Sequence, residues 1–257
     1  MLKVENISYK IGNKLLLEDV SATFEAGKLN LIIGPNGAGK STLIKVICNQ
    51  IQPSNGNVYY GEKNIKSLSN AETAKIRAVL SQNIELAFPL KVWEVVMMGR
   101  YPHFSSKPTE NDEEACKSAM HFFDVRDMAE RDYMTLSGGE KQRVHFARVL
   151  SQIWFPAENN YRYLILDEPL TFLDIYYQFQ FMKKIQELLL QKNIVVVGVV
   201  HDLNLAARFA DYILLMNKGK VLANGSVKEV LIKENIREAY GMEVKILEVD
   251  QYLQLYF

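Results

Sequence analysis

Residues 34–41 read Gly-Pro-Asn-Gly-Ala-Gly-Lys-Ser and fit the pattern GxxxxGK[ST], which constrains the fold more than any other segment of the chain. An apolar run at residues 29–33 precedes them and predicts a buried strand, and a helical pattern at residues 42–49 follows. In a strand–loop–helix unit of this kind, backbone N–H groups surround phosphate oxygens and the helix N-terminus adds a positive dipole end. The segment therefore predicts a phosphate-binding loop in an α/β fold. The alternative, a glycine-rich turn with an exposed lysine, fits the flanking strand and helix poorly.

Two side chains of this loop carry specific chemistry. Lys40 supplies a positive charge for the β and γ phosphates, and Ser41 offers a hydroxyl group to Mg²⁺. ATP and Mg²⁺ are therefore the cofactors that the loop predicts. The residues expected to contact the nucleotide here are Gly34, Asn36, Gly37, Gly39, Lys40, Ser41 and Thr42.

A second apolar run, at residues 163–166, ends in two adjacent carboxylates, Asp167 and Glu168. Neighbouring side chains near a strand end point in different directions, so the two acids can have different tasks. We expect Asp167 to hold Mg²⁺, directly or through water, and Glu168 to polarise the attacking water as a general base. Two solvated acids in a turn before Pro169 are the alternative, which is weaker beside a phosphate loop.

Ser137, Gly138 and Gly139 precede a helical pattern and predict a second anion-binding helix N-terminus. One chain has little use for two phosphate-binding devices with only one lysine-bearing loop. Two chains docked head to tail could instead enclose two ATP molecules, each between the phosphate loop of one chain and the Ser137 loop of the other. An ordinary N-cap before an amphipathic helix remains an open alternative.

Short β-branched runs alternate with helical patterns along the chain, which is typical of a parallel sheet covered by helices. Residues 29–33, 163–166 and 194–200 are expected to form the central sheet, and the alternating patterns at 2–9 and 17–24 predict an antiparallel β lobe. Capping boxes begin at Ser69 and Thr109, and a hairpin is expected at 212–223. We predict one domain, residues 1–257, made of a core with its β lobe (1–87 and 138–225), an inserted α-helical subdomain (88–137), and a C-terminal segment (226–257) of one or two helices and a last strand.

Charge and hydropathy exclude several classes of function. Thirty basic and thirty acidic residues balance, so no overall field draws the chain to nucleic acid. The apolar run at 194–200 is far shorter than the roughly 20 residues that span a bilayer, and residues 1–6 show no signal-peptide pattern. Cys48 and Cys116 lie far apart and suit free thiols in a reducing compartment. A cytoplasmic protein that reaches a membrane only through a partner is the expectation.

Residues 34–41, 136–140 and 164–168 together resemble the ATP-binding subunits of ABC transporters, in order and in spacing, over essentially the whole chain. The Leu-Ser-Gly-Gly sequence at 136–139 separates this family from P-loop kinases and GTPases. The resemblance implies a P-loop NTPase (RecA-like) core with an antiparallel β lobe and an inserted α-helical subdomain. It also implies that the chain is an ATPase that works as a dimer.

The resemblance assigns roles to residues that local chemistry leaves open. Gln82 matches the glutamine that reaches Mg²⁺ and the attacking water, and His201 matches the switch histidine that contacts the γ-phosphate and orients water with Glu168. Asp174 matches the loop that crosses the dimer interface. Tyr9 occupies the place of an aromatic ring that stacks on adenine, although its local pattern favours a packing residue.

One segment of the chain departs from the family pattern. Many relatives have Thr-Ser-Ala where residues 170–172 read Leu-Thr-Phe, and these bulkier groups beside Asp174 are expected to tune dimer packing or communication between the two sites. Asp202 is expected to cap the helix at 203–209, because no serine elbow suited to a hydrolytic triad is present.

Within the family, residues 82–90 and 94–103 resemble subunits that serve iron-siderophore, haem and cobalamin importers. Residues 151–162 lengthen the link before the Asp167 strand, and similar lengthening with a tryptophan such as Trp154 is typical of haem-importer subunits. Haem is therefore the expected cargo, with a ferric siderophore or cobalamin as alternatives and a lineage-specific surface loop as the plain interpretation. A soluble ABC ATPase, such as an Fe–S assembly factor, is the alternative from another class.

The resemblance also implies partners. We expect a second copy of the chain, two membrane permease subunits and, indirectly, a periplasmic or surface substrate-binding protein, with the ATPase peripheral on the cytoplasmic face of the bacterial inner membrane. Phe88, Pro89, Val92 and Trp93 are candidates for a groove that receives a permease helix, and core packing is equally open for Val92 and Trp93. The cargo is not expected to touch this subunit, so its histidines need not bind haem.

Overall fold

The computed structural model describes residues 1–81, 89–156, 161–171, 173–191 and 193–257. A six-stranded sheet lies at its centre, and all of its strands but β10 run parallel. In sheet order the strands are β10 (Lys220–Gly225), β9 (Tyr212–Asn217), β3 (Leu29–Ile33), β8 (Ile194–Val199), β7 (Arg162–Asp167) and β6 (Arg77–Leu80). The apolar runs at 29–33, 163–166 and 194–200 thus form the central strands, as predicted.

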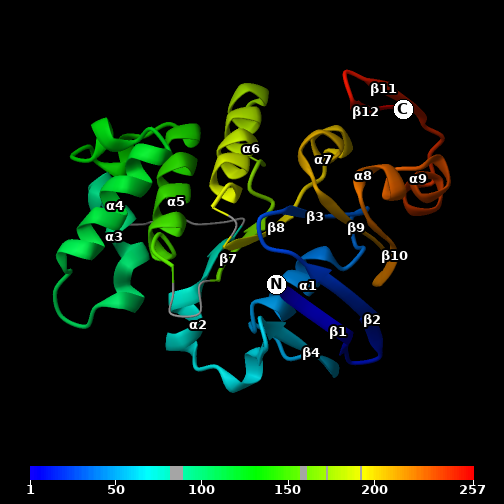
Figure 1. Cartoon of the computed structure of the whole chain (residues 1–257), viewed down its shortest axis with the longest axis horizontal. Helices are drawn as coiled ribbons and strands as arrows, with labels where there is room; N and C mark the ends of the chain where they lie inside the picture. Colours follow the sequence, from blue (N-terminus) through cyan, green and yellow to red (C-terminus); the bar gives the residue numbers. More distant parts are fainter. Residues whose placement is uncertain (82–88, 157–160, 172, 192) are drawn as a thin grey trace.

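The continuous apolar runs are explained by burial on both faces of this sheet. Along β8, Ile194 and Val196 belong to one hydrophobic cluster, whereas Val195, Val197 and Val199 belong to another. The first cluster fills the space under α6 (Ile175–Leu189) and α7 (Leu203–Phe209), and the second fills the space under α1 (Lys40–Ile47). Alternate side chains of one strand therefore hold helices on opposite faces (Figure 1).

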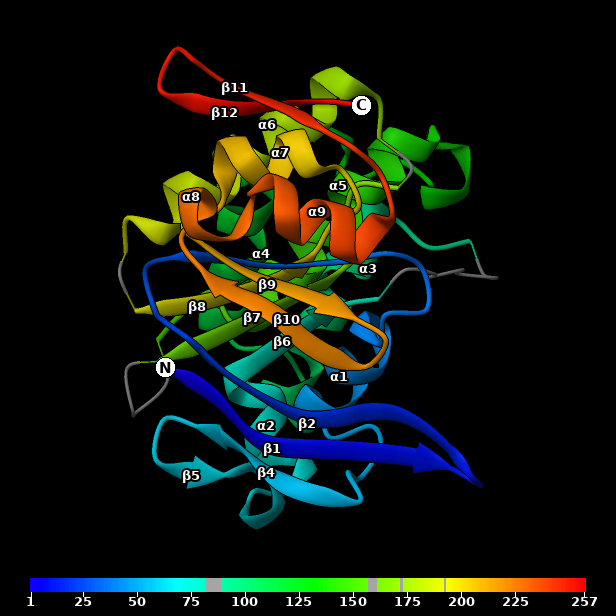
Figure 2. The same ribbon diagram turned by 90° about the vertical axis from the view of Figure 1, so that its right-hand side faces the viewer.

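The predicted β lobe is a four-stranded antiparallel sheet that packs against the second cluster, and Figure 2 shows it below the main sheet. In sheet order its strands are β2 (Lys14–Phe24), β1 (Leu2–Ile11), β4 (Asn55–Tyr60) and β5 (Lys63–Asn64). A short η1 (Ile65–Ser67) and α2 (Asn70–Ile76) then return the chain to β6. Ser69 caps α2 in the predicted capping box with Glu72.

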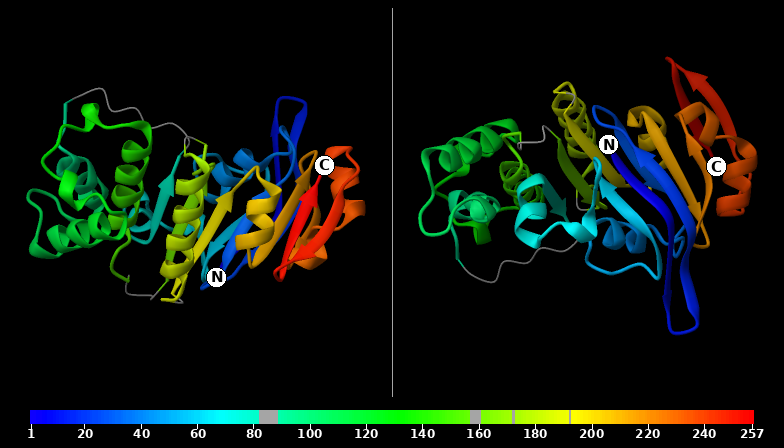
Figure 3. Two further views of the ribbon diagram at one scale, coloured as in Figure 1. Left: turned by 90° about the horizontal axis from the view of Figure 1, so that it is seen from above. Right: turned by 60° about the horizontal axis from the view of Figure 1, so that its bottom comes forward.

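The helical subdomain lies at one end of the molecule, beyond β6 (Figure 3). Its elements are α3 (Val92–Met97), η2 (Met98–His103), α4 (Glu110–Phe122), η3 (Arg126–Met128) and η4 (Tyr133–Thr135), against which α5 (Gly138–Gln152) packs. Thr109 caps α4 in the predicted capping box with Asp112. Ser137 caps the expected helix α5, and its capping box with Glu140 was not predicted. Val92 is fully buried and Trp93 packs on the core, so the groove interpretation is wrong for Val92.

The C-terminal segment differs from the prediction. After α8 (Val227–Val230) and α9 (Lys233–Tyr240) the chain forms two strands, β11 (Lys245–Val249) and β12 (Tyr252–Tyr256), instead of one. Asp250 and Gln251 at the turn both have positive φ, the geometry of a two-residue hairpin turn that usually contains glycine or asparagine. Aspartate is common at the first of these positions, but Gln251 stands where glycine is usual, so the sequence does not mark the turn. A smaller correction is that α1 begins at Lys40, two residues before the predicted start.

Candidate nucleotide site

The backbone of the loop between β3 and α1 requires glycine. Gly34, Gly37 and Gly39 all have positive φ, where other residues are strained. A Cβ atom on Gly34 would also lie 2.2 Å from the carbonyl oxygen of Met216 on the neighbouring strand β9. The loop therefore packs directly on the sheet and ends at the N-terminus of α1, the arrangement that suits phosphate binding.

Lys40, the first residue of α1, reaches back over this loop. Its Nζ atom donates hydrogen bonds to the carbonyl oxygens of Gly34 at 2.8 Å and Pro35 at 3.0 Å. Burial lowers the pKa of Lys40, and the carboxylates of Glu168 and Asp167 act in the opposite direction. The ammonium group is therefore held close to both the loop and the two acids.

Asp167 ends β7 and Glu168 follows it, and the sequence predicts different tasks for the two acids. Glu168 Oε1 lies 2.8 Å from His201 Nε2, which extends from the end of β8. The backbone of Glu168 has φ +52°, a region that costs energy for a residue other than glycine and is typical of functional sites. Since β7 and β8 are adjacent parallel strands, their carboxyl ends bring Glu168 and His201 together.

Asp167 is half-buried. Its Oδ1 atom is buried and has no hydrogen-bond partner within the described part of the chain, and burial together with the neighbouring Glu168 raises the pKa of Asp167. A buried carboxylate oxygen without a partner suits a hard cation, and Mg²⁺ prefers oxygen ligands. Asp167, with the Ser41 hydroxyl on α1, is therefore a chemically fitting place for Mg²⁺.

A cavity of about 460 Å³ lies beside the phosphate loop. Besides residues 36–42 of the loop and α1, it is lined by Glu168 and His201. Five lining residues were missed by the sequence interpretation: Lys14, Leu15, Leu16, Lys218 and Gly219. They belong to two hairpins, and the Gly219 N–H donates to the Ala38 carbonyl oxygen at 3.0 Å. No motif marks them, because only the tertiary fold places these hairpins beside the loop.

Among the described residues, Gly34, Asp167 and the predicted site residues outside the loop other than Glu168 and His201 do not line this cavity. Tyr9 is on β1, partly buried against the second hydrophobic cluster, and Gln82 lies outside the described residues. Ser137 caps α5, with Gly138 and Gly139 following it in the first turn. Asp174 caps α6 by accepting a hydrogen bond from the Tyr177 N–H at 3.0 Å.

Two glutamines that the sequence did not single out hold the segment after Glu168. Gln142 of α5 donates to the Pro169 carbonyl oxygen at 3.0 Å, and Gln178 of α6 donates to the Leu170 carbonyl oxygen at 3.2 Å. Leu170 is buried in the first hydrophobic cluster, whereas Phe172 lies outside the described residues. Leu170 is thus part of the core beside the Asp174 loop.

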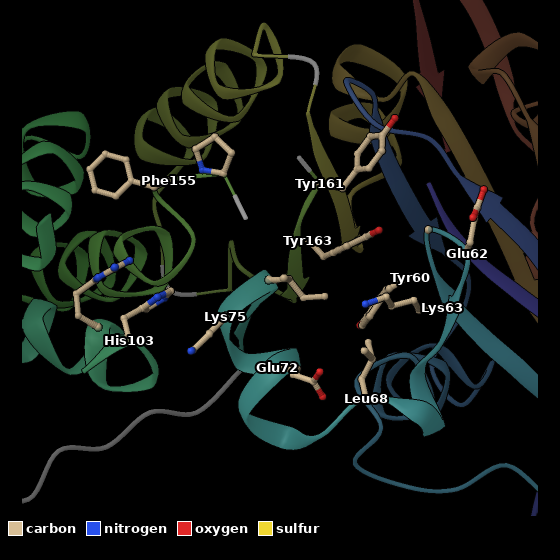
Figure 4. A pocket seen from close by; sticks show the side chains of 14 residues that line it. Tyr60, Glu62, Lys63, Leu68, Glu72, Lys75, His103, Phe155, Tyr161 and Tyr163 are labelled. Atoms are coloured by element: carbon tan, nitrogen blue, oxygen red, sulfur yellow. The ribbon is translucent and has the colours of Figure 1, made fainter. Parts of the chain in front are cut away.

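A larger cavity, of about 780 Å³, lies away from the phosphate loop (Figure 4). Phe155 and Tyr161, from the lengthened link, line it with 41% and 42% of their surface exposed. The other lining residues are Tyr60, Gly61, Glu62, Lys63, Leu68, Glu72, Lys75, Ile76, Arg100, His103, Pro156 and Tyr163. Trp154 packs edge-on against Phe122, so the lengthened link is tied to the helical subdomain.

Within the described ranges, no helix is both long and apolar enough to cross a membrane.

His145, one of the four histidines, is buried with its Nε2 atom 2.7 Å from the Tyr133 hydroxyl group.

Comparison with known proteins agrees with this arrangement. The family model described as "ABC transporter" matches residues 17–171, and the chain belongs to this family, whose P-loop ATPase fold it has. Among curated relatives, it is 40% identical to the hemin import ATP-binding protein HmuV of Escherichia coli O157:H7 over 96% of this chain and 95% of that one. It is 42% identical to the protein of the same name in Gloeobacter violaceus, over 96% of this chain and 90% of that one.

Among solved structures, the ADP conformation of the ATP-binding cassette MJ1267 of an ABC transporter has a TM-score of 0.81 and 26% identity, covering 95% of this chain and 99% of that one. The dimeric ABC transporter cassette MJ0796 has a TM-score of 0.73 and 25% identity, covering 88% of this chain and 99% of that one.

Proposed function

We propose that the chain binds and hydrolyses ATP to power an importer of haem. The observation that carries the ATPase part is the Glu168–His201 contact of 2.8 Å at the rim of the phosphate-loop cavity. Support for haem comes from the near full-length similarity to proteins named as hemin import ATP-binding proteins. Ferric siderophores and cobalamin are the competing cargoes.

In this proposal each residue of the pair has a task. Glu168 accepts the proton of the attacking water as general base, and His201 fixes the carboxylate through its Nε2 atom and contacts the γ-phosphate. Lys40 leaves its two carbonyl contacts to neutralise the β and γ phosphates. Mg²⁺, held by Ser41 and Asp167 with help from Gln82, would neutralise charge that develops on the phosphate oxygens.

The active species is a head-to-tail dimer. Ser137, Gly138 and Gly139 at the N-terminus of α5 would close over the ATP of the partner subunit, with Asp174 at the interface and Tyr9 against the adenine. Because the closed dimer makes γ-phosphate contacts that the open one lacks, ATP shifts the population toward closure and hydrolysis releases it. Two membrane permeases would receive this motion, and the subunit would lie peripherally on the cytoplasmic face of the membrane.

Glu168→Gln tests the ATPase part. The amide keeps the shape of the side chain but cannot accept the proton, so steady phosphate release should fall by about 10³-fold or more while ATP still traps a dimer on size exclusion. Lys40→Ala is the matched control, since it should lose ATP binding and therefore dimer formation as well. Normal phosphate release by Glu168→Gln would overturn the general-base assignment.

Cargo is tested separately, with the subunit reconstituted in vesicles with its cognate permease. ATP-driven uptake of haem, a ferric siderophore and cobalamin is compared, with Glu168→Gln as the inactive control. Uptake of haem alone is expected. Uptake of one of the other chelates would keep the ATPase and replace the cargo, whereas failure of the hydrolytically active subunit to bind the permease would favour a soluble ABC ATPase.

A further inference from the structure

The C-terminal hairpin, β11 and β12, packs on the helix that follows His201. This helix, α7, has seven residues, and its apolar side chains face the core, whereas Asn204 and Arg208 face outward. They are four residues apart and therefore lie on the same side of the helix. The hairpin covers this side, as the red strands above α7 in Figure 2 indicate.

The Asn204 side chain forms two hydrogen bonds with the backbone of β12, in the manner of a neighbouring strand. Its Nδ2 atom donates to the Leu255 carbonyl oxygen at 3.1 Å, and its Oδ1 atom accepts from the Leu255 N–H at 2.8 Å. The Leu255 side chain is 3% exposed and belongs to the first hydrophobic cluster. The Asn204 amide therefore pairs with both backbone groups of Leu255, a buried strand residue. These two hydrogen bonds fix the position of β12 relative to α7.

Arg208 makes a second connection one turn later. Its guanidinium carbon lies 5.0 Å from the centre of the Tyr252 ring on the hairpin and 5.4 Å from the centre of the Phe179 ring on α6. The arginine is thus held between the hairpin and the helix that Asp174 caps.

The geometry points to the C-terminal hairpin as a positioning element for His201, an inference that rests on the proposed ATPase function. Asp202 caps α7 by accepting hydrogen bonds from the backbone N–H groups of Asn204 and Leu205, at 2.7 and 3.0 Å. The position of Asn204 therefore sets that of the residue next to His201. Loss of the hairpin contacts would let the first turn of α7 rotate and would lengthen the contact of His201 with Glu168.

The test uses the full chain and four variants. In Asn204→Ala and Tyr252→Leu, kcat for ATP should fall by about tenfold or more, because a misplacement of an ångström or less already costs up to about 10² in rate. Binding of a non-hydrolysable ATP analogue should stay within about twofold, since residues 34–42 are untouched. Tyr252→Phe keeps the ring over Arg208 and should restore the wild-type rate. Tyr256→Ala is the matched hairpin control.

A coupling measurement separates positioning from general loss of stability. If Asn204 acts through His201, Asn204→Ala should lower the residual rate of a His201→Ala variant by less than about twofold. An effect of Asn204→Ala that is as large with His201 absent as with it present would overturn the inference. So would wild-type kcat in Asn204→Ala and Tyr252→Leu. Absence of hydrolysis in the wild-type chain would instead contradict the proposed function.

Discussion

His145 on α5 offers a measurable link between pH and stability. Its side chain is 4% exposed, and burial, with smaller effects of Arg148 and Lys141, lowers the pKa of His145 to about 4. In the unfolded chain the imidazole of His145 becomes protonated near pH 6.5. In the folded chain it becomes protonated only near pH 4. Stability is therefore lost as the pH falls through this window, by roughly 2 kcal/mol at pH 5 and roughly 3 kcal/mol at pH 4.

The assay is urea unfolding at pH 7.5 and pH 5 for the wild type and His145→Gln. The amide stays neutral and can still meet the Tyr133 hydroxyl group, so the variant should lose about 2 kcal/mol less than the wild type between the two pH values. His121→Gln is the control, because His121 is exposed on α4 and should change nothing. Parallel losses in wild type and His145→Gln would refute the reasoning.

Four further substitutions test the packing in and beside the helical subdomain by chemical denaturation. Asp112→Ala leaves Arg100, which is 5% exposed, without its carboxylate at 2.9 Å and should cost about 4 kcal/mol, whereas Glu130→Ala in an exposed ion pair should cost less than about 1 kcal/mol. A Cβ atom on Gly99 would lie 2.1 Å from a carbonyl oxygen of α5, so Gly99→Ala should cost about 1–3 kcal/mol. Gly138→Ala meets no atom within 4 Å and should leave stability within about 0.5 kcal/mol. Equal stabilities of the Gly99→Ala and Gly138→Ala variants would contradict the close approach at Gly99.

Local signals predicted much of this fold. The strands at 29–33 and 194–200 were visible because burial on both faces leaves an unbroken apolar run. Ser69 and Thr109 were visible because each capping box is encoded within four residues. Phosphate-loop residues were equally clear, since their backbone needs glycine at fixed positions.

Features that depend on distant segments were not predictable. Leu16 and Lys218 line the nucleotide cavity only because two hairpins meet beside α1, and neither hairpin has a composition that signals this contact. The hydrogen bonds between Asn204 and Leu255 join residues 51 positions apart. A sequence pattern carries periodicity and turn chemistry, but it carries no information on which exposed polar group will meet which strand.

The two residues of the proposed catalytic pair, Glu168 and His201, are held by different parts of the chain. Glu168 is held through its downstream neighbours, whose carbonyl oxygens accept from Gln142 on α5 and Gln178 on α6. His201 is followed by the Asp202 cap and by the Asn204 contact with the hairpin. The 2.8 Å contact therefore depends on the helices that Ser137 and Asp174 cap, and these two residues are proposed to meet the partner subunit. A rigid displacement of α5 on closure of the dimer would move Gln142 together with Ser137. The same helix would therefore link partner binding to the position of Glu168.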